Sequence, residues 1–192
     1  MSLNDLLTPD AVIASLRVNG KKQALQELSD RAAVVSGLPA REIFDSILQR
    51  ERLGPTGVGD GIAIPHGKLV KCRRIFGVFA RLERPIDFEA LDGLPVDLIF
   101  LLIAPESAGA DHLKALATIA RKLRNANFAA QLRATRDASA IYSMMTLTPT
   151  SHAAWNIASS SFASAVVTRP WRRSSPAIKH PCPSPRRQAR RD

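Results

Sequence analysis

The chain has 192 residues, of which 45% are hydrophobic and 23% charged, a composition typical of a globular protein with room for one ordinary domain. No apolar run reaches the roughly 18 to 20 residues of a membrane-spanning helix, so we expect no membrane insertion. The first residues lack the basic and apolar segments of a signal peptide, and two cysteines make no disulfide framework, which favours a cytoplasmic protein.

The net charge of +10 is unevenly distributed along the chain. Residues 149–192 contribute +7 and residues 1–148 only +3. A basic segment of this kind can bind nucleic acid through counterion release. The nearly neutral body and the aromatic content of 5% argue against that function, so nucleic-acid binding by the tail is kept only as an alternative.

Helical and strand patterns alternate up to about residue 147, which predicts an α/β protein. Taken in chain order, the predicted elements are a strand at 12–18, a helix from 21 to a C-cap at 37, a helix from 39 to 54, a strand at 62–64, strands at 75–82 and 96–103, and helices at 112–125, 127–134 and 137–145. The run at 96–103 is almost continuously apolar, as expected for a central strand that is covered on both faces.

The helix at 112–125 is predicted from its spacing and from a capping residue. Asp111 stands where an N-cap would, because its carboxylate can accept hydrogen bonds from the first helical amides. The residues expected on its buried face are Leu113, Leu116, Ala120 and Leu123.

The pattern changes after Leu147. Six of the thirteen prolines, a Ser/Ala stretch and the basic run PRRQARR follow, without apolar periodicity. We therefore predict a domain at 1–147 and a disordered basic tail at 148–192.

The most informative segment is the glycine-rich loop GPTGVGDG (54–61), followed by IAIPHG. Four glycines in eight residues permit the close backbone approach that surrounds an anion with amides. The loop lacks the Gly-Lys-Ser/Thr ending of a nucleotide-binding loop, and a strand rather than a helix follows it. His66 stands between Pro65 and Gly67 at the expected end of that strand. From spacing alone, an ordinary loop histidine remains the more common interpretation.

The segment RERLGPTGVGDGIAIPHG resembles the phosphorylation site of enzyme IIA proteins of the mannitol/fructose class in the bacterial phosphotransferase system. The opening LNDLLTPDAVIASL is similar to that of the nitrogen-regulatory members, and the likeness covers about residues 1–147. The resemblance implies a mixed β-sheet flanked by helices on both faces. It also implies a phosphocarrier that receives its phosphoryl group from an HPr-type protein and needs no cofactor or metal.

Carried over residue by residue, the resemblance implies three catalytic positions. His66 matches the phosphorylated histidine, His112 in ADHLKAL the second active-site histidine, and Arg50 in QRERLG the arginine of a phosphate clamp. A guanidinium presents a planar fork to phosphoryl oxygens and stays charged at any relevant pH. Thr56 and Gly57 lie in the matched loop and are weaker candidates for contact with phosphate.

Two downstream roles stay open at this point. In the first, the chain is a nitrogen or metabolic regulator, and its phosphorylation state decides which target proteins it binds. In the second, it is a sugar-specific enzyme IIA that passes phosphate to an enzyme IIB of a transporter. Either role requires protein partners.

Overall fold

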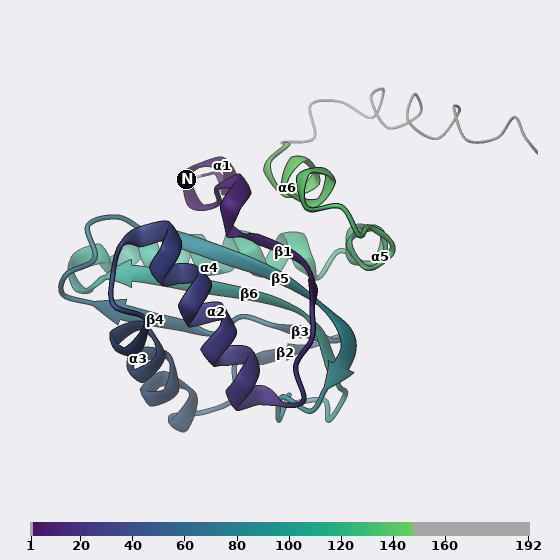
Figure 1. The fold of residues 1–192 in the computed structure, drawn as a ribbon, viewed down its shortest axis with the longest axis horizontal. Coiled ribbons are helices and arrows are strands. Elements are labelled where there is room, and N and C mark those ends of the chain that lie inside the picture. Colours follow the sequence, from purple (N-terminus) through teal and green to yellow (C-terminus); the bar gives the residue numbers. More distant parts are fainter. Residues whose placement is uncertain (1, 148–192) are drawn as a thin grey trace, which may run out of the picture. The chain divides into compact units, whose positions relative to one another are not determined.

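A computed structural model describes residues 2–147 of the chain, and a six-stranded mixed sheet forms its centre (Figure 1). The strands are β1 (Val12–Leu16), β2 (Gly57–Gly59), β3 (Ile62–Ala63), β4 (His66–Leu69), β5 (Phe76–Ile86) and β6 (Val96–Pro105). β6 pairs antiparallel with β5 and parallel with both β3 and β4. β1 pairs parallel with β5, and β2 pairs antiparallel with β3.

Helices cover both faces of this sheet. They are α1 (Leu3–Leu6), α2 (Lys21–Ser36), α3 (Ala40–Arg52), α4 (Gly109–Leu123), α5 (Ala126–Ala134) and α6 (Ala138–Thr146). In Figure 1, α2 and α3 cross in front of the strands and α4 runs behind them. The predicted α/β class, with a mixed sheet between helices, is therefore confirmed. Within residues 2–147, none of the helices has the length and apolar character needed to cross a membrane.

The core is built around β6. Every residue from Leu98 to Ala104 is fully buried, because helices lie over both faces of this strand. An apolar side chain at every position removes both faces from water, which explains why the run does not alternate. The sequence prediction of a central strand at 96–103 is confirmed, and the strand continues to Pro105.

The start of α4 differs from the prediction. The helix begins at Gly109 after the N-cap Ala108, so Asp111 lies inside the first turn and does not cap it. Of the residues expected on its buried face, Leu123 is buried and Leu116 and Ala120 pack partly buried against the core, but Leu113 is 67% exposed. The other buried side chains of the helix are His112, Ala115 and Ile119. A polar histidine holds an inward position that the apolar pattern assigned to its neighbour.

Several strand limits also differ from those predicted. β1 ends at Leu16, β5 runs on to Ile86, and α1 and β2 were not expected. The strand predicted to end at Pro65 resumes as β4 immediately after it. Proline has no amide hydrogen to donate, but the Pro65 carbonyl accepts a hydrogen bond from Leu102 N at 2.9 Å, so β6 stays paired along this segment. The predicted tail at 148–192 lies outside the described residues, and the domain boundary stays a prediction.

Packing between β5 and β6 requires a glycine at position 77. A Cβ there would lie 2.6 Å from Cζ of Phe100, which is fully buried. We expect Gly77→Ala to lower the free energy of unfolding by about 1–3 kcal/mol, the usual cost of overpacking a core, when measured by urea denaturation. Gly20→Ala is the control, because a Cβ at that position meets no atom within 4 Å. Equal losses in the two variants would contradict this account.

Candidate functional site

His66 is the first residue of β4 and is paired in register with Leu102 of β6. The next residue, Gly67, is buried where α3 packs against β4. A Cβ on Gly67 would lie 2.5 Å from the hydroxyl oxygen of Ser46 in α3, so only glycine permits this close approach. The approach brings the C-terminal part of α3, which carries Arg50, to the side of His66.

Both ring nitrogens of His66 are engaged. Nδ1 lies 2.9 Å from the carbonyl oxygen of Ile64, and Nε2 lies 3.0 Å from Nε of Arg50. A carbonyl only accepts and an arginine Nε–H only donates, so the hydrogen of the neutral ring belongs on Nδ1 and the lone pair on Nε2. The surroundings thus select one tautomer, with its lone pair directed toward the guanidinium.

Arg50 lies in the last turn of α3 and is anchored at two points. Its Nε donates to His66 Nε2, and one Nη donates to the carbonyl of Gly54 at 3.0 Å. The carbonyl fixes the plane of the guanidinium, and among residues 2–147 no hydrogen bond engages the other Nη. The group is therefore held against His66 with N–H donors left for an anion.

His112 approaches the same ring from α4. The two imidazole centroids are 5.4 Å apart and the rings are tilted by 58°. His112 is only 6% exposed, and its buried Nε2 has no hydrogen-bond partner within residues 2–147. Because buried polar atoms are normally paired, this unpaired nitrogen is an unusual feature of the site.

The surroundings favour the neutral form of both histidines. Burial lowers the pKa of His66, an effect that the hydrogen bond to the Ile64 carbonyl opposes and the charge of Arg50 reinforces. The pKa of His112 is lowered to about 4, first by burial and then by His66 and Lys68. Desolvation disfavours the charged imidazolium, so the pair supplies lone pairs rather than positive charge.

The structure places Thr56 and Gly57 near these side chains without directing their polar groups toward them. The backbone amide of Thr56 donates to Glu51 Oε1 at 3.1 Å and its hydroxyl to Oε2 at 2.5 Å. Gly57 is buried in β2, and a Cβ there would lie 2.6 Å from that of Ala90. The fold thus brings His66, Arg50 and His112 together, while contact between the loop residues and phosphate stays a prediction.

Two charged residues near the site were not anticipated from the sequence. Lys68 follows His66 by two positions in β4, and its charge contributes to the low pKa of His112. Residues two apart in a strand lie on the same face, so a strand predicted to continue past Pro65 would have placed Lys68 on the face of His66. Glu51, next to Arg50, is a buried carboxylate, and no pattern in the sequence separates it from the other acidic residues of that helix.

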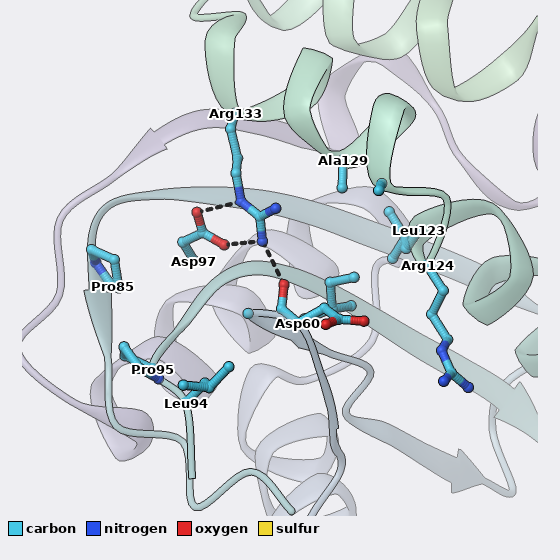
Figure 2. A pocket seen from close by; sticks show the side chains of 12 residues that line it. Asp60, Pro85, Leu94, Pro95, Asp97, Leu123, Arg124, Ala129 and Arg133 are labelled. Carbon is cyan, nitrogen blue, oxygen red and sulfur yellow. Dashed lines mark hydrogen bonds and ion pairs between the residues drawn. The ribbon is translucent and has the colours of Figure 1, made fainter. Parts of the chain in front are cut away.

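A cavity of about 490 Å³ lies elsewhere, where the ends of α4 and α5 meet the turn before β3 (Figure 2). Arg133 crosses it, pairing with both carboxylate oxygens of Asp97 at 2.7 and 2.8 Å and donating to the carbonyl of Asp60 at 2.7 Å. None of the predicted site residues lines this cavity. Within residues 2–147, no three His, Cys, Asp or Glu side chains form a group that could hold a metal ion.

Comparisons with known proteins show which chains this one resembles in sequence and in fold. A nitrogen regulatory protein of Bradyrhizobium diazoefficiens is 62% identical over 149 residues, which cover 78% of this chain and 97% of that protein. A nitrogen regulatory protein of Escherichia coli K12 is 39% identical over 147 residues, which cover 76% and 90%. The crystal structure of nitrogen regulatory protein IIA-Ntr from Neisseria meningitidis has a TM-score of 0.71 at 32% identity, covering 75% of this chain and 98% of that one.

Residues 5–147 match the family described as "Phosphoenolpyruvate-dependent sugar phosphotransferase system, EIIA 2". The matched segment includes both histidines, Arg50 and every strand of the sheet. The chain belongs to the EIIA 2 family of the phosphoenolpyruvate-dependent sugar phosphotransferase system.

Proposed function

We propose that this chain is a phosphocarrier that holds a phosphoryl group covalently on His66 and regulates partner proteins through its phosphorylation state. Membership of the EIIA 2 family supports the phosphotransfer role in general. The observation that carries the assignment to His66 is its fixed tautomer, with a lone pair on Nε2 beside a guanidinium and a second imidazole. A neutral nucleophile, a cation and an unpaired polar atom are what transfer of an anionic group requires.

The proposed attacking atom is Nε2 of His66. Its lone pair would form a bond to the phosphorus of a donor phosphohistidine, while the donor's N–P bond breaks and its electron pair returns to the donor imidazole. Positive charge that develops on the His66 ring is stabilised at Nδ1–H by the Ile64 carbonyl, 2.9 Å away. Because the transition state is loose, positioning and charge neutralisation supply most of the catalysis.

Arg50 would exchange one acceptor for another in this step. The hydrogen bond from Arg50 Nε–H to His66 Nε2 must break as the phosphorus arrives. The planar guanidinium would then face the phosphoryl oxygens. The His112 ring lies beside that of His66, with centroids 5.4 Å apart, and its Nε2 has no partner within residues 2–147. In the tautomer that carries the hydrogen on Nε2, this atom would donate to a phosphoryl oxygen once the donor is bound. The assignment needs no metal and no small-molecule cofactor.

An HPr-type phosphocarrier is the proposed donor. A donor histidine that belongs to a protein needs a docking surface around the acceptor. Leu53, after Arg50 at the end of α3, is 83% exposed, and Leu113, next to His112, is 67% exposed. Two exposed leucines so close in sequence to Arg50 and His112 support docking of a protein partner.

The regulatory role is favoured over sugar transport because the similar proteins cited above are nitrogen regulatory proteins. The family description refers to a sugar phosphotransferase system, which keeps the alternative of an enzyme IIB as acceptor. Incubating the ³²P-labelled chain with purified enzyme IIB proteins distinguishes the two, since only a transport component passes its label on rapidly. Either role places the proposed activity in the cytoplasm.

His66→Ala should abolish phosphorylation when the chain is incubated with phosphoenolpyruvate, enzyme I and an HPr-type carrier and followed by intact mass. In the parent, the label should be acid-labile and alkali-stable, as a phosphoramidate is, and ³¹P–¹H NMR should place it on Nε2. His180→Ala, in the C-terminal segment, is the control and should label normally. Label that persists in His66→Ala would refute the assignment.

Arg50→Lys should slow phosphorylation by roughly 10- to 100-fold, because one ammonium cannot contact both His66 and the Gly54 carbonyl as the fork does. The final extent of labelling should be unchanged, since the nucleophile remains. Arg52→Lys is the matched control: the neighbouring arginine is exposed and should be replaceable without effect. Equal rates in Arg50→Lys and the parent would remove Arg50 from the site.

Acidification should destabilise the fold through His112. Its folded pKa of about 4 lies below its ordinary value, so between pH 6.5 and 4 the unfolded chain binds a proton that the folded chain does not. This stability is complete above pH 6.5 and is lost as the pH falls toward 4. Urea unfolding of His112→Gln, which cannot titrate, should therefore depend less on pH over this range than that of the parent. Identical pH profiles would contradict the buried neutral state.

A further inference from the structure

The proposed transfer does not use Glu51, although its carboxylate lies directly behind the site. Its side chain is 4% exposed, and three donors from two other segments surround it. Lys21 Nζ, at the start of α2, is 3.0 Å from Oε1, and the amide and hydroxyl of Thr56 complete the set at 3.1 and 2.5 Å. A buried charge is tolerated when it is paired and hydrogen-bonded in this way.

The charge of Glu51 is balanced by Lys21. Burial lowers the pKa of Lys21, but hydrogen bonds to Glu89 and Glu51 outweigh it and leave the pKa raised, so the ammonium is retained. Glu89 is an exposed partner, with 75% of its side chain accessible. The buried pair therefore joins the start of α2 to the end of α3, immediately after Arg50.

One chain of hydrogen bonds leads from Glu51 to Nδ1 of His66. Thr56, whose amide and hydroxyl are held by Glu51, accepts from the amide of Ile64 through its own carbonyl at 2.9 Å. The carbonyl of Ile64 then accepts from His66 Nδ1. The links between Thr56 and Ile64 are backbone groups, so we expect a displacement of Thr56 to reach the imidazole.

A second path leads from Glu51 to Nε2. The short segment after α3 is tied down at Gly54, whose carbonyl holds Arg50, and at Thr56, which Glu51 holds. Arg50 in turn donates to His66 Nε2. The contacts at both nitrogens of His66 thus depend on the Glu51 carboxylate, through separate routes.

We propose that Glu51 is a positioning residue that sets the tautomer and orientation of His66, so that Nε2 is presented to the phosphoryl donor. The inference rests on the proposed function of His66 and assigns to Thr56 a structural link where the sequence suggested a phosphate ligand. Glu51 touches no reacting atom in this account. It acts through Thr56, Ile64 and Arg50.

The test uses full-length Thr56→Val and Glu51→Gln. Valine at position 56 replaces the hydroxyl with a methyl group of similar size. Glutamine at position 51 replaces one acceptor oxygen with an NH₂ donor, which then faces a donor of Thr56 or Lys21. We expect phosphorylation about tenfold slower or more in both, because small misplacements of a nucleophile are costly. The ¹⁵N shifts of His66 should show loss of the single Nδ1–H tautomer, and Glu51→Gln should lower the His66 pKa further, since the Glu51 charge raises it.

Two matched controls separate positioning from stability. Asp97→Asn weakens the ion pair with Arg133, which lies at the distant cavity, and should lower the melting temperature without changing the His66 spectrum or the rate. Thr56→Ser retains the hydroxyl that Thr56→Val lacks, so it should have the parental His66 spectrum and phosphorylation rate. Glu89→Gln removes only the exposed partner of Lys21 and should behave like the parent.

The outcomes are distinguishable from a failure of the proposed function. If Thr56→Val and Glu51→Gln retain the parental His66 spectrum and phosphorylation rate, Glu51 is only a structural residue. The same conclusion follows if Asp97→Asn changes the spectrum and the rate as much, at an equal loss of stability. If instead the parent takes no phosphate on His66, the proposed function fails. The NMR comparison still decides whether Glu51 orients the ring.

Discussion

The arrangement of this site depends on the two hydrogen bonds that hold the His66 imidazole, one at each nitrogen. The Ile64 carbonyl requires a hydrogen on Nδ1, and the Arg50 guanidinium requires a lone pair on Nε2. A ring in solution exchanges between tautomers, whereas this ring has one. The packing of α3 against β4 at Gly67 serves this pair of contacts, because it sets how close Arg50 comes.

Partial burial gives the site its electrostatic character. It favours the neutral form of both imidazoles, an effect that the charges of Arg50 at His66 and Lys68 at His112 reinforce, and the neutral form is the nucleophilic one. The same burial leaves His112 Nε2 without a partner, a cost that the folded protein bears. Under the proposed function, an incoming phosphoryl group would be attracted by the cations that already lie at the site.

The sequence by itself determined the class of fold and named the candidate residues of the site. The apolar run of β6 requires a covered central strand, and the spacing of 21–37 and 39–54 requires helices, because burial of apolar surface is local information that any packing must respect. The resemblance to enzyme IIA proteins made His66 and Arg50, in the segment around IPHG, and His112, in ADHLKAL, candidates for the site. All three lie together in the structure.

Only the tertiary structure decided how these residues are placed and what they contact. That His66 opens a strand, that His112 rather than Leu113 faces inward, and that Thr56 is bound to Glu51 all depend on contacts between segments far apart in the chain. Periodicity shows which face of an element is apolar. It carries no information on contacts with other elements, so it cannot predict which polar side chain is buried by them. The tautomer of His66 depends on its contacts with Arg50 and Ile64, and the position of Glu51 on its contacts with Thr56 and Lys21.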